Sequence, residues 1–277
     1  MTKQKKFIAG GCSFTFGHEL SDDQEGKAPS KKSWAYGLRR TTEADQYICT
    51  ARPGSGNSGI ARRVFNAVAN NKHVKGVVGM WSFLSRYDWA MPRNNVLEDT
   101  RWTNISPWDT NMAAEERHQA LAGSEAQQEQ WKQRQESMQE TGVKPFAEAI
   151  YKYGANQYHE IYLSWKSIIW LQNILEKKKI PYMFTLADNS LFYQELQHHR
   201  DQDPFMKALH NEIDFRKWFS FGPRMMGFNQ WALLEEYPRG TTHPLDEAHQ
   251  DAVKLMLPTF NKLIGGDNVH LDKEPDQ

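Results

Sequence analysis

The strongest constraint on the fold is an alternation of short apolar segments with longer helix-like segments near the start of the chain. Lys6–Gly10, Gln46–Ala51 and Lys75–Ser82 each have the length and apolar content of a buried strand. The helix-like stretches Lys31–Thr42 and Ile60–Asn70 separate them. Strands and helices that alternate in this way are joined by crossovers into a parallel sheet, and the helices cover both of its faces.

The same pattern returns later in the chain. A long amphipathic helix is predicted over Pro145–Lys179, a fourth strand over Ile180–Asp188 and a final helix over Leu245–Leu263. We therefore expect a single α/β domain over residues 1–277. Its predicted architecture is a flavodoxin-like three-layer α/β/α sandwich with a parallel sheet of about five strands.

Residues 84–144 interrupt this pattern and are predicted to be a largely helical or irregular insertion. Their polar second half, Ala113–Gly142, has too few aliphatic residues for a core of its own. The tryptophans of the insertion suggest a lid over the site, a contact with a second copy of the chain, or a staple that holds the insertion to its own domain. These tryptophans are Trp89, Trp102, Trp108 and Trp131.

Composition excludes several classes of protein. The 34 basic residues balance the 34 acidic residues, so no net charge attracts nucleic acid or an anionic membrane. No apolar run approaches the roughly 20 residues of a membrane span or the core of a signal peptide. Cys12 and Cys49 do not have the pattern of a disulfide framework or a zinc site. We expect a soluble cytoplasmic protein with no metal and no cofactor, and a polar tail over residues 267–277.

The stretch "GGCSFTFGHEL" places Ser13 directly after the first predicted strand. Glycines at a strand end allow a sharp turn that displays a nucleophile, although a serine in this position also commonly caps a helix. A serine hydroxyl needs a neighbouring base before it becomes a good nucleophile. The candidate base is His243, which precedes Pro244 at the start of the final predicted helix. His249 lies six residues further on, which is the wrong spacing for a helical metal pair.

A third segment, "PGSGNSG", follows the second predicted strand and opens the next helix. Backbone N–H groups at such a turn bind anions, and in a hydrolase they stabilise the oxyanion. Because the carboxyl ends of parallel strands meet at one edge of the sheet, this loop is expected on the same side as Ser13.

In chain order these three segments resemble the SGNH (GDSL-like) hydrolase family. "GGCSFTFG" is similar to the first family block, "RPGSGNSGIARR" to the second and "THPLDEAHQDAV" to the last. The resemblance covers Lys6–Ser82 and Ile180–Leu263 and implies that Ser13 is the nucleophile, His243 the general base and Gly56 an oxyanion donor. The Gly-Cys-Ser-Phe-Thr form of the first block favours a bacteriophage origin.

The sequence departs from the family pattern at the triad acid. The family places this acid three residues before the histidine, where this chain has Gly240. Three carboxylates are close in sequence, and of these we nominate Glu236 and Asp246 as possible acids. Glu235 is the third.

Two further departures lie in the other blocks. The family has an oxyanion-donating asparagine after the third strand, where this chain reads "GMWSFLSR", so Ser82 or Asn57 is expected to substitute as donor. Cys12 also stands where the family usually has an aspartate before the serine.

Two functions from different classes follow from this pattern. The first is a serine hydrolase that cleaves an ester, either an O-acyl group on a carbohydrate or a small acyl ester. The alternative is a catalytically weak or inactive SGNH-fold protein that serves in binding or phage assembly, for which a virion location is an option. A third and weaker interpretation makes Cys12 the nucleophile.

Overall fold

The computed structural model describes residues 4–24, 26–92, 101–110, 125–192 and 203–265. Its main sheet has four strands, all parallel, in the order β2-β1-β3-β6. The strands are β1 (Lys6–Gly10), β2 (Gln46–Cys49), β3 (Val74–Trp81) and β6 (Tyr182–Leu186). The four predicted strands and their parallel arrangement are confirmed.

The expectation of about five strands is wrong for the described part of the chain. At the edge where a fifth strand would pair with β6, the chain forms only an isolated parallel bridge between Phe184 and Trp218. The residues around this bridge form short helices and turns instead of an extended segment. They are η3 (Asn189–Leu191), α10 (Pro204–Asn211), η4 (Phe215–Lys217) and α11 (Phe228–Leu234).

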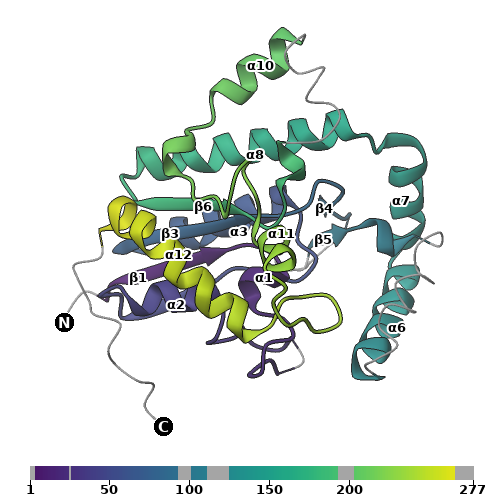
Figure 1. Cartoon of the computed structure of the whole chain (residues 1–277). Coiled ribbons are helices and arrows are strands. Elements are labelled where there is room, and N and C mark those ends of the chain that lie inside the picture. The colour runs from purple at the N-terminus through teal and green to yellow at the C-terminus, as the bar shows by residue number, and fades with distance from the viewer. Residues whose placement is uncertain (1–3, 25, 93–100, 111–124, 193–202, 266–277) are drawn as a thin grey trace.

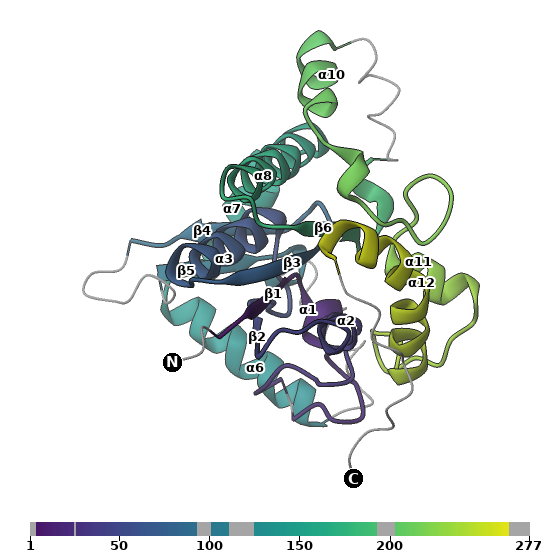
Figure 2. The same ribbon diagram turned by 90° about the vertical axis from the view of Figure 1, so that its left-hand side faces the viewer.

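Helices cover both faces of the sheet, as the sequence predicts (Figures 1 and 2). One face packs against α3 (Asn57–Asn70) and α8 (Gln157–Lys177), and the other against α2 (Trp34–Arg40) and α12 (Asp246–Ile264). Successive strand residues alternate between the two cores, so Ile8 faces α3 and α8 whereas Phe7 faces α2 and α12. Both side chains are fully buried.

The order of the strands creates a crevice at one edge of the sheet. From β1 the chain crosses to β2 on one side and then returns to β3 on the other side of β1. The loops after β1 and β3 therefore diverge at their carboxyl ends, which is where open α/β sheets bind ligands. Ser13 and Ser82 both follow strands at this position.

The predicted helix over Pro145–Lys179 is wrong as a single element. The structure has a short helix α7 (Val143–Ala149), a π-helical turn over Ile150–Gly154, and then α8. The break has a local cause, because Asn156 is extended and its side chain accepts a hydrogen bond from the N–H of His159. This is an N-cap, which starts a new helix.

A small third core forms around the insertion, and the polar second half of the insertion supplies little of it. The strands β4 (Tyr87–Ala90) and β5 (Trp102–Ile105) pair antiparallel and pack with α6 (Glu125–Glu140) and α7. The core residues are Tyr87, Met91, Ile105, Met138, Val143 and Ala147. The wholly buried Asp109 adds an ion pair with Arg134, at 2.9 Å between Oδ1 and Nε. The strands and α7 supply the apolar residues that the polar half lacks.

Two tryptophans of the insertion make contacts within the chain. The Arg62 guanidinium of α3 lies 4.4 Å from the centre of the Trp102 ring and is paired with Asp88 of β4. Trp89 is 46% exposed and packs edge-on against Phe146 of α7. These contacts support the staple interpretation for both residues, and the predicted contact with a second copy stays a prediction.

The structure gives limited information on the predicted absence of a membrane span and none on the predicted tail. Within the described ranges no helix has the length and hydropathy needed to cross a membrane. The predicted polar tail over residues 267–277 lies outside the described residues.

His249 connects α12 to α2 through a buried hydrogen bond. Its Nδ1 accepts from the N–H of Trp34 at 3.1 Å, and its side chain is 1% exposed. Burial, and secondly the proximity of His243, lower the pKa of His249 to about 3. The ring is therefore neutral in the folded protein at pH values where the unfolded chain binds a proton.

We expect this difference to make folding sensitive to mild acid. Between about pH 6.5 and pH 3 the unfolded state binds more protons at this position, so stability is complete above pH 6.5 and falls as the pH is lowered. The expected loss between pH 6.5 and pH 5 is on the order of 2 kcal/mol. The test is the free energy of unfolding in urea, measured against pH for the wild type and for His249→Asn. The asparagine keeps an acceptor near the position of Nδ1 but does not titrate. A pH dependence that is the same in both proteins would contradict this prediction.

Candidate active site

Ser13 is the first residue of a very short helix at the carboxyl end of β1. Only two residues separate the end of the strand from this helix, α1 (Ser13–Phe16), which stops at Gly17 in the left-handed conformation. The strand therefore fixes the position of Ser13 through a very short connection. The Ser13 side chain lies in a nearly closed environment, with the residue 6% exposed.

The structure brings His243 to Ser13 from the other end of the chain. His243 lies in the loop before α12, and its Nε2 is 2.7 Å from Ser13 Oγ. The Phe14 ring packs edge-on against the imidazole, with 4.9 Å between ring centroids. The two residues that the sequence nominated as nucleophile and base are thus in hydrogen-bond contact.

The carboxylate at the other imidazole nitrogen belongs to Glu19, which follows α1. Glu19 Oε2 is 3.1 Å from His243 Nδ1, and the same oxygen accepts from the backbone N–H groups of Thr242 and His243, each at 2.9 Å. The Glu19 side chain is only 6% exposed. Because a carboxylate only accepts hydrogen bonds, it fixes the proton on Nδ1 and leaves Nε2 to accept from Ser13.

This arrangement corrects the two acids nominated from the sequence. Asp246 accepts from the N–H and hydroxyl of Ser21 at 2.9 and 2.6 Å and pairs with Lys32 at 2.8 Å. Glu236 is exposed at a turn with a positive φ of 56°. Within the part of the chain that the structure describes, neither of these carboxylates contacts His243. Proximity in sequence was a poor guide because the carboxylate that contacts His243 comes from the segment after Ser13.

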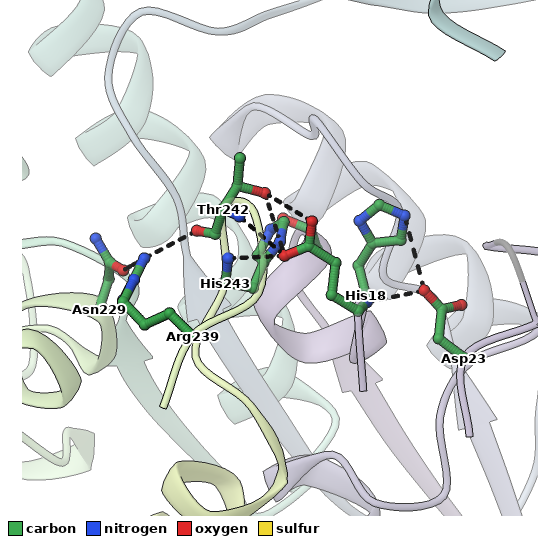
Figure 3. Close-up of polar contacts among 8 residues, drawn as sticks. His18, Asp23, Asn229, Arg239, Thr242 and His243 are labelled. Carbon is green, nitrogen blue, oxygen red and sulfur yellow. Dashed lines mark hydrogen bonds and ion pairs between the residues drawn. The ribbon is translucent and has the colours of Figure 1, made fainter. Parts of the chain in front are cut away.

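Thr242 and Arg239 support the same loop (Figure 3). Thr242 Oγ1 is 2.8 Å from His243 Nδ1 and 3.4 Å from Glu19 Oε1. The Arg239 guanidinium donates to the carbonyl of Thr242 at 2.9 Å and to the side chain of Asn229 at 3.1 Å. Burial lowers the pKa of Arg239, and the nearby Glu19 carboxylate opposes that shift. Arg239 is therefore a positive group close to Glu19.

The backbone N–H of Glu19 is held by Asp23. Glu19 has a positive φ of 70°, an uncommon conformation for this residue type. Asp23 Oδ2 accepts from the Glu19 N–H at 2.8 Å, and Asp23 Oδ1 accepts from the Gly26 N–H at 2.8 Å. The neighbouring His18 ring packs edge-on against His243, with 5.4 Å between ring centroids.

Gly240 makes room for Glu19. A Cβ added at Gly240 would lie 2.8 Å from Glu19 Oε2 and 3.2 Å from Glu19 Cδ. Gly240, where the sequence resemblance led us to expect the acid, is thus the residue against which the Glu19 carboxylate packs. In the sequence, the only traces of this contact are the glycine at the expected acid position and a glutamate six residues after Ser13, and neither one points to the other.

We expect Gly240→Ala to disturb this contact. The added methyl group has to displace the Glu19 carboxylate, so the kcat of the ester hydrolysis proposed below should fall by about tenfold, the equivalent of roughly 1.4 kcal/mol in the barrier. In a Glu19→Ala background the same substitution has space and should change kcat by less than about twofold. Rates with a p-nitrophenyl acyl ester in the four proteins of this cycle measure the coupling. Equal effects in both backgrounds would contradict it.

Of the nominated oxyanion donors, Asn57 has a structural role. Its amide nitrogen donates to the carbonyl of Ser82 at 3.1 Å and to the hydroxyl of Ser164 at 3.0 Å, while its oxygen accepts from the N–H of Ser82 at 2.7 Å. The Asn57 residue is 2% exposed. Both amide hydrogens are therefore used inside the protein, and the side chain ties the start of α3 to the end of β3.

The other two nominated oxyanion donors, Gly56 and Ser82, lie where the start of α3 meets the end of β3. Gly56 precedes α3, and a Cβ there would lie 2.2 Å from the carbonyl oxygen of Arg86, so the loop after β3 passes directly over it. Ser82 has no exposed surface, and its hydroxyl accepts from Arg86 Nη1 at 2.9 Å. Within the described part of the chain, the N–H groups of Ser13 and Gly56 donate to no acceptor.

We expect Asn57→Ala to act on stability. The substitution leaves buried groups of Ser82 without partners, which costs about 1–3 kcal/mol in the free energy of unfolding. Urea unfolding measures this loss, and Asn66→Ala in the same helix, at an exposed position, is the control. A loss in Asn57→Ala no larger than in the control would show that the network around Ser82 does not stabilise the fold.

Comparisons with known proteins show only a distant likeness. No family model matches the sequence, and no curated protein matches it. A member of the lipolytic protein G-D-S-L family from Veillonella parvula is 12% identical with a TM-score of 0.42, covering 94% of this chain and 100% of that one. A GDSL-like lipase from Bacteroides thetaiotaomicron is 12% identical with a TM-score of 0.39, covering 95% and 90%. These values are too low to say anything about activity, so the function must be argued from the site.

Proposed function

We propose that this protein is a serine hydrolase that cleaves esters. The observation that carries the proposal is the continuous relay of Ser13 Oγ, the two nitrogens of His243 and Glu19 Oε2, with contacts of 2.7 and 3.1 Å. The three side chains come from two distant segments and are nearly buried. Such a relay has the geometry of a nucleophile, a base and an orienting acid.

The mechanism follows from the proton positions. Ser13 Oγ attacks the ester carbonyl carbon while its proton passes to His243 Nε2, and Glu19 stabilises the imidazolium that forms. The imidazolium then gives the proton to the departing alcohol, which leaves an acyl-serine. Water attacks this acyl-serine with His243 again as the base, and the free acid and Ser13 are regenerated.

The oxyanion that forms in each step needs hydrogen-bond donors. We assign this role to the backbone N–H groups of Ser13 and Gly56, which have no acceptor within the described residues. The Ser82 hydroxyl is the third candidate, because its oxygen accepts from Arg86 and its own hydrogen is left to donate. Asn57 is not part of the proposal.

The substrate class rests on the resemblance of the three sequence blocks. An O-acyl group on a carbohydrate or a small acyl ester is proposed. The nucleophile is Ser13, since Cys12 is fully buried and has no contact with His243 among the described residues. The bacteriophage origin also stays a proposal that rests on the first block alone.

A fluorophosphonate probe tests the proposal without knowledge of the substrate. It reacts only with an activated serine, so the wild type should be labelled at Ser13, and Ser13→Ala should not. Peptide mapping by mass spectrometry identifies the labelled residue. A folded wild-type protein that is not labelled would contradict the hydrolase and favour the binding or assembly role.

The role of Glu19 has its own test. We expect Glu19→Ala to lower kcat on the order of 10³-fold because the imidazole loses its orienting partner. Glu236→Gln and Asp246→Asn are matched controls and should stay within about threefold of the wild type. Adding Gly240→Asp to Glu19→Ala should raise kcat at least tenfold above that of Glu19→Ala alone. The new aspartate returns a carboxylate to the position that the SGNH family uses. If Gly240→Asp restores no activity and the two control variants are as slow as Glu19→Ala, Glu19 has no specific role in the mechanism.

A further inference from the structure

His243 and two neighbouring side chains form a potential metal site. One of the three side chains has no part in the proposed relay. His18, Glu19 and His243 each offer one ligand atom, and these atoms all lie within 4.8 Å of one another. Two of them, Glu19 and His243, belong to the proposed relay, whereas His18 does not. Two imidazoles and one carboxylate form a ligand set that is typical of Zn²⁺ and unlike the all-oxygen sets of Mg²⁺ and Ca²⁺.

The spacing of the three ligand atoms is close to what Zn²⁺ requires. With bonds of about 2.0–2.2 Å, ligands in a tetrahedral site lie roughly 3.3 Å apart. Glu19 Oε2 and His243 Nδ1 are already 3.1 Å apart, so only the His18 ring has to approach. The His18 side chain is 18% exposed and is the most accessible of the three, which gives an ion a route from solvent.

Asp23 provides a second, independent feature of such a site. Its Oδ2 lies 3.8 Å from His18 Nε2, and the same oxygen accepts from the N–H of Glu19 at 2.8 Å. Histidine ligands of zinc commonly donate their other ring N–H to a carboxylate, which orients the ring and raises its basicity. Asp23 faces His18 Nε2 at ion-pair distance, beyond the reach of a hydrogen bond, while it fixes the backbone of Glu19.

We propose that His18, Glu19 and His243 bind Zn²⁺ and that the bound ion switches the hydrolase off. In the relay, Nδ1 of His243 carries the proton and Nε2 accepts from Ser13. When Nδ1 binds the metal, the single proton of the neutral imidazole lies on Nε2. The ring then has no lone pair for the Ser13 proton, and Glu19 is withdrawn to the metal. Imidazole stays neutral throughout, so protons balance.

The regulatory part of this proposal rests on the proposed hydrolase, but the binding part does not. Equilibrium dialysis with Zn²⁺ alone on Ser13→Ala therefore tests the site in a protein that cannot turn over. We expect one Zn²⁺ per chain, at least tenfold weaker binding when His18→Ala or His18→Gln is added, and no effect of adding His159→Ala at an exposed helix position. Binding that is unaffected by both His18 variants would overturn the proposal.

The inhibition is tested on the active protein through the rate of fluorophosphonate labelling. Saturating Zn²⁺ should slow labelling of the wild type at least tenfold, EDTA should restore it, and Mg²⁺ should have no effect. In His18→Ala, the ratio of the rates with and without Zn²⁺ should be close to one, and this ratio is independent of the basal rate. If bound Zn²⁺ does not change the labelling rate of the wild type, the proposed inhibition is wrong. The proposed hydrolase would still stand in that case, because Ser13 is labelled.

Discussion

The buried carboxylate of Glu19 is the group on which the arrangement of the site depends. It accepts hydrogen bonds from the backbone of Thr242 and His243 and faces the imidazole ring. A charged group that is 6% exposed is costly unless donors surround it, so the segment after Ser13 and the loop before α12 are stable only when they are together. The same contact that satisfies the charge therefore also assembles the relay.

The fold supplies the rigidity that this contact needs. β1 is paired on both sides, by β2 and by β3, and Ser13 follows it almost at once. On the other side of the contact, the buried hydrogen bond from Trp34 to His249 holds α12 against α2, and His243 lies just before that helix. Because both supports are buried, the relay is set by packed elements and not by a mobile loop.

His243 Nδ1 is the atom at which the proposed catalysis and the proposed metal binding exclude each other. In the hydrolase it holds a proton that Glu19 fixes, and in the zinc complex it holds the metal. One nitrogen cannot do both, which makes the two proposals mutually exclusive states of one site. The insertion is attached to α3, because Arg62 of α3 pairs with Asp88 and stacks on Trp102.

The sequence by itself determined the four strands, their parallel arrangement, and the nomination of Ser13 and His243, because strand periodicity and the three short blocks are local signals. It did not determine the break between α7 and α8 or the small core around the insertion, which depend on a local cap and on packing partners far along the chain. It also predicted about five strands where the described sheet has four. Glu19 was missed for the same reason. Only the tertiary structure shows that the space left at Gly240 is filled by a carboxylate from a segment more than two hundred residues away in the sequence, because no local pattern encodes a contact between two distant loops.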